Sequence, residues 1–168
     1  MRFETPFGPA RVSVDASGAV TEFSFGAGDD GDAGGGFNAE VARQIEEFFG
    51  GTRQDFDFRL APKGTAFQKR VWAELVKIPF GETISYGELA RRIGNPAASR
   101  AVGRANGTNP IAVIVPCHRV IGTNGKLTGY GGGIDLKEKL LAWERGIKVG
   151  QAIAADVGET AARNMYRW

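Results

Sequence analysis

The start and stop signals of two short helices near the middle of the chain constrain its fold most. Ser85-x-x-Glu88 has the pattern of a capping box, and it predicts a helix over residues 86–93 that Gly94 ends. Asn95-Pro96 then supplies an N-cap and a first-turn proline for a second helix, over about residues 97–106. Two short helices joined by a tight glycine turn are typical of a helix-turn-helix, although a helical hairpin in any core gives the same signals.

Further helix and strand signals flank this pair. Thr65-x-x-Gln68 is another capping box, and the helix that it opens is expected to end at Pro79-Phe80-Gly81. The apolar run at residues 111–115 predicts a buried strand or extended segment. Asp135 is the expected cap of a last amphipathic helix, which Gly146 is expected to end.

The first sixty residues predict a small α/β domain. Three short strands are expected at residues 3–5, 10–14 and 20–25. Asn38 can cap a helix that Gly50-Gly51 stops, and the alternating residues 55–58 could form one more strand. The predicted fold class is therefore α/β (α+β): an antiparallel sheet with a helix, followed by a mainly helical C-terminal domain.

The charges divide the chain at the same place as the predicted elements. Residues 1–60 have 5 Lys or Arg and 11 Asp or Glu, a net charge of −6, whereas residues 61–168 have 16 and 8, a net charge of +8. A basic half beside an acidic half is expected when one half faces a polyanion, but chance clustering of solvated charges explains it equally well. We predict an N-terminal domain at 1–60, a C-terminal domain at 61–148 and a tail of unknown role at 149–168.

The chain has one cysteine, Cys117, and one histidine, His118, and they are adjacent. This composition excludes an internal disulfide framework and a Cys/His zinc cluster. The sequence has no apolar run of about 20 residues and no secretory signal, so we expect a cytoplasmic protein with no membrane partner.

A lone cysteine is most often a buried small hydrophobic residue, but a neighbouring base raises the thiolate fraction of a thiol. Cys117 and His118 are therefore candidates for a nucleophile and its base. Glu144 is the candidate that orients the imidazole. We expect it near a helix C-terminus, where the helix dipole disfavours an anion unless a partner is present.

Pro116-Cys117-His118-Arg119-Val120 resembles the active-site signature of the O6-alkylguanine–DNA alkyltransferases, or methylated-DNA–protein-cysteine methyltransferases. The resemblance runs from about Gly64 to Gly146. It includes the motifs Phe67-Gln68-x-x-Val71-Trp72, Ser99-Arg100-Ala101-Val102-Gly103, Asn109-Pro110 and Leu127-Thr128-Gly129-Tyr130-Gly131-Gly132-Gly133.

The resemblance implies a role for each matching residue. Cys117 accepts the alkyl group, His118 acts as its base through a water, and Glu144 orients His118. Asn109 is a hinge, and Tyr86 presses on the DNA backbone and donates to the guanine. Arg100 is an arginine finger that fills the space of the flipped nucleotide. The remaining candidates are the guanine pocket residues Val120, Tyr130, Gly131 and Gly132, and the DNA-binding residues Ser99, Ala101 and Arg104.

The resemblance also implies the fold and the partners. The N-terminal domain would be ribonuclease H-like, and the C-terminal domain would contain a winged helix-turn-helix. The protein would be a monomer without cofactor or metal that acts on double-stranded DNA containing O6-alkylguanine. It would transfer the methyl group of O6-methylguanine, and also of O4-methylthymine, irreversibly and once per chain. Gly131 stands where some relatives have a polar residue, which would leave room for larger alkyl groups.

Three other functions are compatible with parts of the sequence. An alkyltransferase-like sensor flips the damaged base without reacting, but such proteins lack the acceptor cysteine that this chain has. A cysteine hydrolase would use the same Cys, His and Glu but would not need a helix-turn-helix. A transcription regulator needs a base-reading helix, and residues 97–107 offer few side chains for readout in the major groove.

Overall fold

The computed structural model describes residues 1–26, 36–122 and 133–154. The fold is α+β, and the chain divides into two compact units. Among the described residues, the first unit contains the chain up to Lys63 and the short return segment Pro110–Ile114, and the second contains Gly64–Asn109 and the chain from Val115 to the end of the last helix. No helix in the described part of the chain is long and apolar enough to cross a membrane.

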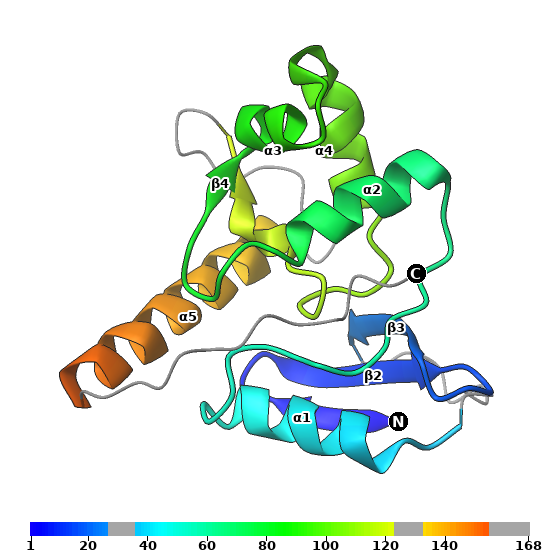
Figure 1. Cartoon of the computed structure of the whole chain (residues 1–168). Helices are drawn as coiled ribbons and strands as arrows, with labels where there is room; N and C mark the ends of the chain where they lie inside the picture. Colours follow the sequence, from blue (N-terminus) through cyan, green and yellow to red (C-terminus); the bar gives the residue numbers. More distant parts are fainter. Residues whose placement is uncertain (27–35, 123–132, 155–168) are drawn as a thin grey trace. The chain divides into compact units, whose positions relative to one another are not determined.

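The first unit is built on a three-stranded antiparallel sheet with the order β1-β2-β3 (Figure 1). The strands are β1 (Arg2–Thr5), β2 (Gly8–Val14) and β3 (Val20–Phe25), which confirms the three predicted strands. Helix α1 (Ala39–Phe49) starts at Asn38, whose side chain accepts hydrogen bonds from the backbone of Glu40 and Val41. The ring of Phe49 stacks on Phe23 of β3, so α1 closes the core over one face of the sheet.

Two expectations for the first unit are wrong. Residues 55–58 form no strand; instead the Asp57 backbone N–H donates to Gln44 on α1 at 3.0 Å, and Phe56 packs on Phe48. The run at 111–115 is buried but irregular, and within it only Ile111 makes a bridge, to Phe23. In both segments a few contacts with other elements replace a ladder of backbone hydrogen bonds.

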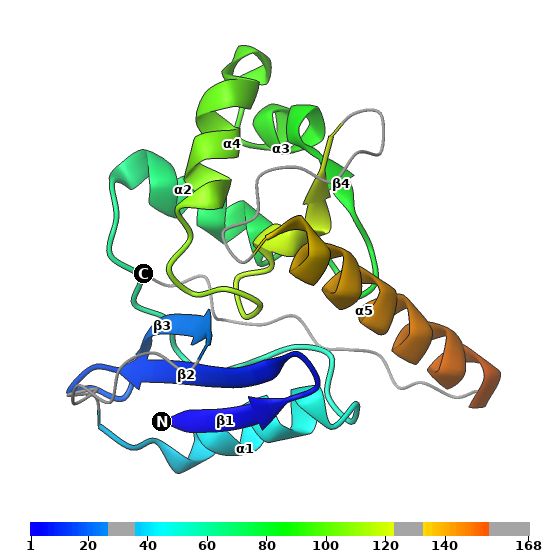
Figure 2. The same ribbon diagram turned by 180° about the vertical axis from the view of Figure 1, so that it is seen from behind.

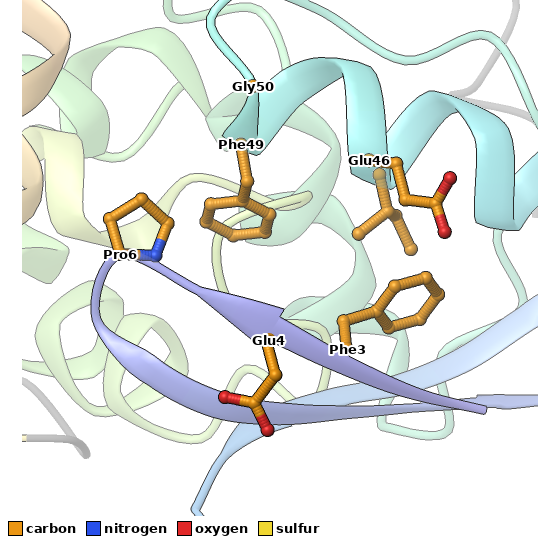
Figure 3. Close-up of a pocket in the computed structure, with 7 residues that line it drawn as sticks. Phe3, Glu4, Pro6, Glu46, Phe49 and Gly50 are labelled. Carbon is orange, nitrogen blue, oxygen red and sulfur yellow. The ribbon is translucent and has the colours of Figure 1, made fainter.

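An open groove of ≈ 250 Å³ lies between β1 and α1 (Figure 3). It is lined by Phe3, Glu4, Pro6, Ile45, Glu46, Phe49 and Gly50. None of these residues belongs to the predicted site.

The second unit begins with α2 (Ala66–Leu75), which has the predicted capping box at Thr65 and Gln68. It ends earlier than predicted, with Val76 as its C-cap. The buried Trp72 on this helix donates from Nε1 to the carbonyl oxygen of Ala105 at 2.8 Å, which fixes α2 against the next helical pair.

That pair is α3 (Tyr86–Arg92) and α4 (Ser99–Gly107), which lie side by side in both views (Figures 1 and 2). Gly94, with φ of 84°, ends α3 as predicted, because glycine tolerates this conformation. The start of the second helix differs from the prediction. Pro96–Ala98 form a 3₁₀ turn, Asn95 makes no side-chain capping bond, and α4 starts only at Ser99.

The remaining elements of the second unit are short except for the last helix. Strand β4 (Ile84–Ser85) pairs in parallel with β5 (Val120–Ile121), directly after the 3₁₀ turn η2 (Cys117–Arg119). Helix α5 (Ile134–Ala154) starts one residue before Asp135 and continues past Gly146, so the predicted cap and end of this helix are both wrong. Lys148 donates to the carbonyl oxygen of Phe80 at 3.3 Å, a contact that supports α5 beyond the glycine.

Candidate active site

Two asparagine side chains tie the turn at residues 115–119, the Cys117 turn, to the end of α4. Asn109 donates from Nδ2 to the carbonyl oxygen of Val115 at 2.8 Å. Asn106, which is buried on α4, donates from Nδ2 to the carbonyl oxygen of Cys117 at 3.3 Å. The position of the thiol is therefore linked to the second helix of the helix-turn-helix pair.

The chain reaches Cys117 through two very tight turns. Val113 has φ of 67°, and Ile114 N–H donates to the carbonyl oxygen of Ala112 at 2.7 Å, the pattern of the rare positive-φ γ-turn. Pro116, with φ −81° and ψ 65°, makes the common inverse γ-turn, in which Cys117 N–H donates to Val115 at 2.8 Å. A β-branched residue at positive φ is strained, and strain of this kind is found where the surrounding structure must hold a functional group.

The thiol of Cys117 is almost fully buried, with 5% of the residue exposed. Burial raises the pKa of Cys117, while a hydrogen bond from Asn109 and the charge of Lys137 oppose that rise. The thiol is therefore neutral at rest and needs a proton acceptor before it can act as a nucleophile.

The imidazole of His118 is held by a buried carboxylate. Its Nε2 lies 2.7 Å from Oε1 of Glu144, and both side chains are buried. Because the ionised Glu144 can only accept, Nε2 carries the proton and Nδ1 keeps a free lone pair. Nδ1 is buried and has no hydrogen-bond partner among the described residues. Burial lowers the pKa of His118 despite the charge of Glu144, so the imidazole is a neutral base.

Glu144 lies inside α5, not near a helix C-terminus as expected, so the helix dipole does not explain its partners. Oε1 accepts from His118 and from Nη2 of Arg119 at 2.8 Å, and Oε2 accepts from Nε of Arg119 at 3.0 Å. The Gly81 N–H adds a contact to Oε2 at 3.3 Å. Burial would raise the pKa of Glu144, but the charges and hydrogen bonds of His118 and Arg119 outweigh it and bring the pKa to about 2.

Lys137 brings two further predicted residues into the same neighbourhood. It is fully buried on α5, and its Nζ donates to the carbonyl oxygen of Val120 at 2.5 Å. The same ammonium lies 5.8 Å from the centre of the Tyr86 ring. Burial lowers the pKa of Lys137, and the interaction with Cys117 opposes that shift.

The other predicted residues of the helical pair lie on the outer side of α4. Arg100 and Arg104 are exposed, and Ser99 and Ala101 are half-buried. Gly103 of α4 faces Tyr86, since a Cβ there would lie 3.9 Å from the tyrosine ring, in ordinary van der Waals contact. Tyr130, Gly131 and Gly132 lie outside the described residues.

The sequence interpretation missed three residues of this site: Asn106, Arg119 and Lys137. The spacing of Lys137 and Glu144, seven residues apart on one helix with the buried Leu140 and Leu141 between them, places both on the same buried face. That spacing was a usable signal for Lys137. Arg119 follows His118 directly, but no periodic pattern shows that its side chain turns inward to Glu144.

A group of three or more His, Cys, Asp or Glu side chains suited to a metal ion does not occur within residues 1–26, 36–122 and 133–154. The polar groups around Cys117 are cations, amides and one carboxylate that already has cationic partners. Such a set fits proton transfer and an anionic sulfur better than it fits metal coordination.

Comparison with known proteins gives a consistent result. The family model described as "6-O-methylguanine DNA methyltransferase, DNA binding domain" matches residues 66–146. The methylated-DNA–protein-cysteine methyltransferase of Methanosarcina acetivorans is 52% identical over 149 residues, which are 84% of this chain and 95% of the relative. That of Mycobacterium tuberculosis is 59% identical over 111 residues, 66% of this chain and 67% of the relative.

Solved structures agree with these relatives. The crystal structure of Mycobacterium tuberculosis OGT in complex with DNA superposes with a TM-score of 0.77 at 45% identity, over 87% of this chain and 92% of that chain. A crystal structure of the M. tuberculosis O6-methylguanine methyltransferase gives a TM-score of 0.74 at 41% identity, over 92% of this chain and 97% of that chain.

Proposed function

The chain belongs to the methylated-DNA–protein-cysteine methyltransferase family, and on this premise we propose that Cys117 is the residue that accepts the alkyl group. The protein repairs DNA by transferring the methyl group of O6-methylguanine to a cysteine. Cys117 is the single cysteine in the sequence, so the assignment of the acceptor follows from composition. The roles of the other site residues rest on geometry and are argued below.

The contact between His118 and Glu144 is the observation that carries the proposal. It fixes the proton of the imidazole on Nε2 and leaves Nδ1 to take the proton of Cys117, directly or through one bridging water. Sulfur then attacks the methyl carbon as the bond from that carbon to O6 breaks. The thioether product gives water no good leaving group, so each chain reacts once.

The leaving guanine needs a proton, because it would otherwise depart as an anion. We assign this role to the Tyr86 hydroxyl, because a phenol can donate a proton and the Tyr86 ring lies 5.8 Å from the buried ammonium of Lys137. The backbone near Val120, Tyr130, Gly131 and Gly132 would form the base pocket, and the missing side chain at Gly131 favours acceptance of larger alkyl groups.

The DNA partner is proposed to be a duplex that contains O6-alkylguanine or O4-methylthymine, bound by a monomer. A methyl group on O6 lies inside the base stack, so the nucleotide must be extruded at a cost of a few kcal/mol. The exposed Arg100 on α4 would enter the vacated space, while Ser99, Ala101 and Arg104 would contact the backbone.

We also retain the finer fold and domain assignments as proposals. The sheet with α1 would be a reduced ribonuclease H-like domain over residues 1–60, and residues 61–148 would be a winged helix-turn-helix domain that binds DNA and accepts the alkyl group. The pairing of β4 with β5 beside α3 supports a wing, although it is a parallel pair and not a hairpin. A reactive lone thiol favours a reducing compartment such as the cytoplasm.

Intact mass measurement tests the proposed acceptor. After incubation with a duplex containing O6-methylguanine, we expect one added methyl group per chain, mapped to Cys117, and no reaction beyond one equivalent. The lone cysteine and the inert thioether both require this stoichiometry. An unchanged mass with intact DNA binding would support the sensor function, and sustained turnover on an ester would support the hydrolase.

Duplex binding is expected to depend weakly on sequence and strongly on salt. Residues 61–168 have a net charge of +8, and α4 offers few side chains that read bases. Each phosphate contact should add a slope of about −0.9 to log affinity against log salt concentration. Fluorescence anisotropy between low and high salt measures the slope, and an affinity that does not change with salt contradicts the proposed mode of binding.

A further inference from the structure

Arg119 is a buried charged side chain whose guanidinium has partners on three sides. Only 6% of the residue is exposed. Its Nε and Nη2 donate to the two oxygens of Glu144 at 3.0 and 2.8 Å, and its Nη1 donates to the carbonyl oxygen of Ile78 at 2.7 Å. The guanidinium also lies 5.6 Å from the centre of the Phe80 ring. A guanidinium held on three sides in this way has a fixed orientation.

Glu144 therefore has one permanently charged partner, Arg119, and one partner, His118, whose charge depends on its protonation. A guanidinium carries a permanent charge, whereas an imidazole can be neutral or charged. If His118 were the only partner of this buried carboxylate, the negative charge would favour the protonated imidazole. A protonated imidazole could not accept the proton of Cys117. Because Arg119 already balances the carboxylate, Glu144 can accept the Nε2 proton of His118 without drawing a second proton onto the ring.

We propose that Arg119 is a positioning residue for alkyl transfer, which holds both oxygens of Glu144 and so keeps His118 neutral and oriented as the base for Cys117. This inference rests on the proposed roles of Cys117, His118 and Glu144. In the resulting sequence the S–H bond of Cys117 breaks and its proton goes to Nδ1 of His118. The sulfur electron pair forms the S–C bond, the C–O6 bond breaks, and the guanine takes the proton of Tyr86.

The charged groups that act on His118 come from two elements. Glu144 and Lys137 lie on α5, and Arg119 lies on η2 with the imidazole itself. Two cations thus oppose a positive charge on His118, and one anion favours it. Removing the charge of Arg119 leaves one cation against one anion, and it shifts the imidazole toward its protonated form.

The single histidine makes a direct test possible, since every imidazole resonance of the protein belongs to His118. We would titrate these resonances by NMR in the unmodified protein and in Arg119→Gln, Arg119→Lys and Arg145→Met. Arg119→Gln keeps a hydrogen-bonding side chain but removes the charge. Arg119→Lys keeps the charge but removes the paired N–H groups that bond both oxygens of Glu144. Arg145 is next to Glu144 in sequence but exposed, so Arg145→Met is the matched control.

The glutamine variant is expected to raise the pKa of His118 by about one unit or more. The acid limb of the rate of benzyl transfer from free O6-benzylguanine should move up in pH by the same amount. The lysine variant should keep the His118 titration near that of the unmodified protein and react a few-fold more slowly, because one oxygen of Glu144 loses one of its two donors. The Arg145 variant should match the unmodified protein in both measurements.

A folded glutamine variant with an unchanged His118 titration overturns the proposal. If that variant does not fold, the lysine variant decides: a His118 pKa that rises although the charge is kept also overturns it. The NMR titration needs no reaction, so it separates this inference from the proposed function, which fails instead when the unmodified protein gains no alkyl group.

Discussion

Cys117→Ser is expected to abolish alkyl transfer and to leave duplex binding intact. The serine hydroxyl has nearly the size of the thiol but stays protonated at neutral pH, even with His118 beside it. The loss should be at least about three orders of magnitude, as for other nucleophiles that act in a unit with their base. Single-turnover transfer from a duplex containing O6-methylguanine, followed by intact mass, measures it.

The control for this variant is its fold, because Cys117 is buried. A buried hydroxyl needs a hydrogen-bond partner, so Cys117→Ala is the companion that places no polar group in the core. Both variants should unfold within a few degrees of the unmodified protein and bind duplex with similar affinity. Measurable methyl transfer by the alanine variant would mean that another residue is the acceptor.

The elements predicted well from the sequence are those whose signals are local. The three strands of the first unit pair with their neighbours in the sequence across short connections. The cap at Asn38 and the capping box at Thr65 depend on side chains within a few residues of the backbone that they satisfy. The same holds for Gly94, whose positive φ ends α3. Local chemistry decided these boundaries, and tertiary contacts did not change them.

The errors in the fold arise where distant contacts compete with local signals. Gly146 predicts a helix end, but a glycine inside a helix costs only about 1 kcal/mol relative to alanine. The contact of Lys148 with Phe80, far away in sequence, is available only if α5 continues. Residues 55–58 alternate like a strand, yet the Asp57 backbone bonds to Gln44 on α1 and not to a neighbouring strand.

The candidate site shows the same division. The adjacency of Cys117 and His118 is visible in the sequence, and the structure brings Glu144 to His118 and Asn109 to the Cys117 turn. Two further members of the site are buried cations: Arg119, which bonds to Glu144, and Lys137, which bonds to Val120. Sequence reasoning places Lys and Arg on the surface by default, because burial is costly unless a partner is present. Only the fold supplies those partners.

Arg100→Ala is expected to slow repair of duplex DNA about tenfold or more while barely changing the reaction with free O6-benzylguanine. If Arg100 fills the space of the flipped nucleotide, its loss raises the cost of extrusion, which is a few kcal/mol. About 1.4 kcal/mol corresponds to a tenfold change in rate, so a tenfold slower repair needs only part of the extrusion cost to return. A free base needs no extrusion, so its transfer to Cys117 bypasses the step. Single-turnover rates on the two substrates measure the ratio.

Two variants make this ratio interpretable. Arg104→Ala removes another exposed arginine, four residues later on α4, so it should weaken duplex binding. Its rate of methyl transfer should equal that of the unmodified protein once the protein is saturated with DNA. Glu144→Gln disturbs His118 and should slow both substrates together. If Arg100→Ala slowed both substrates equally, Arg100 would be supporting the fold or the base pocket, since a residue that acts only on extrusion cannot affect a substrate that is never stacked.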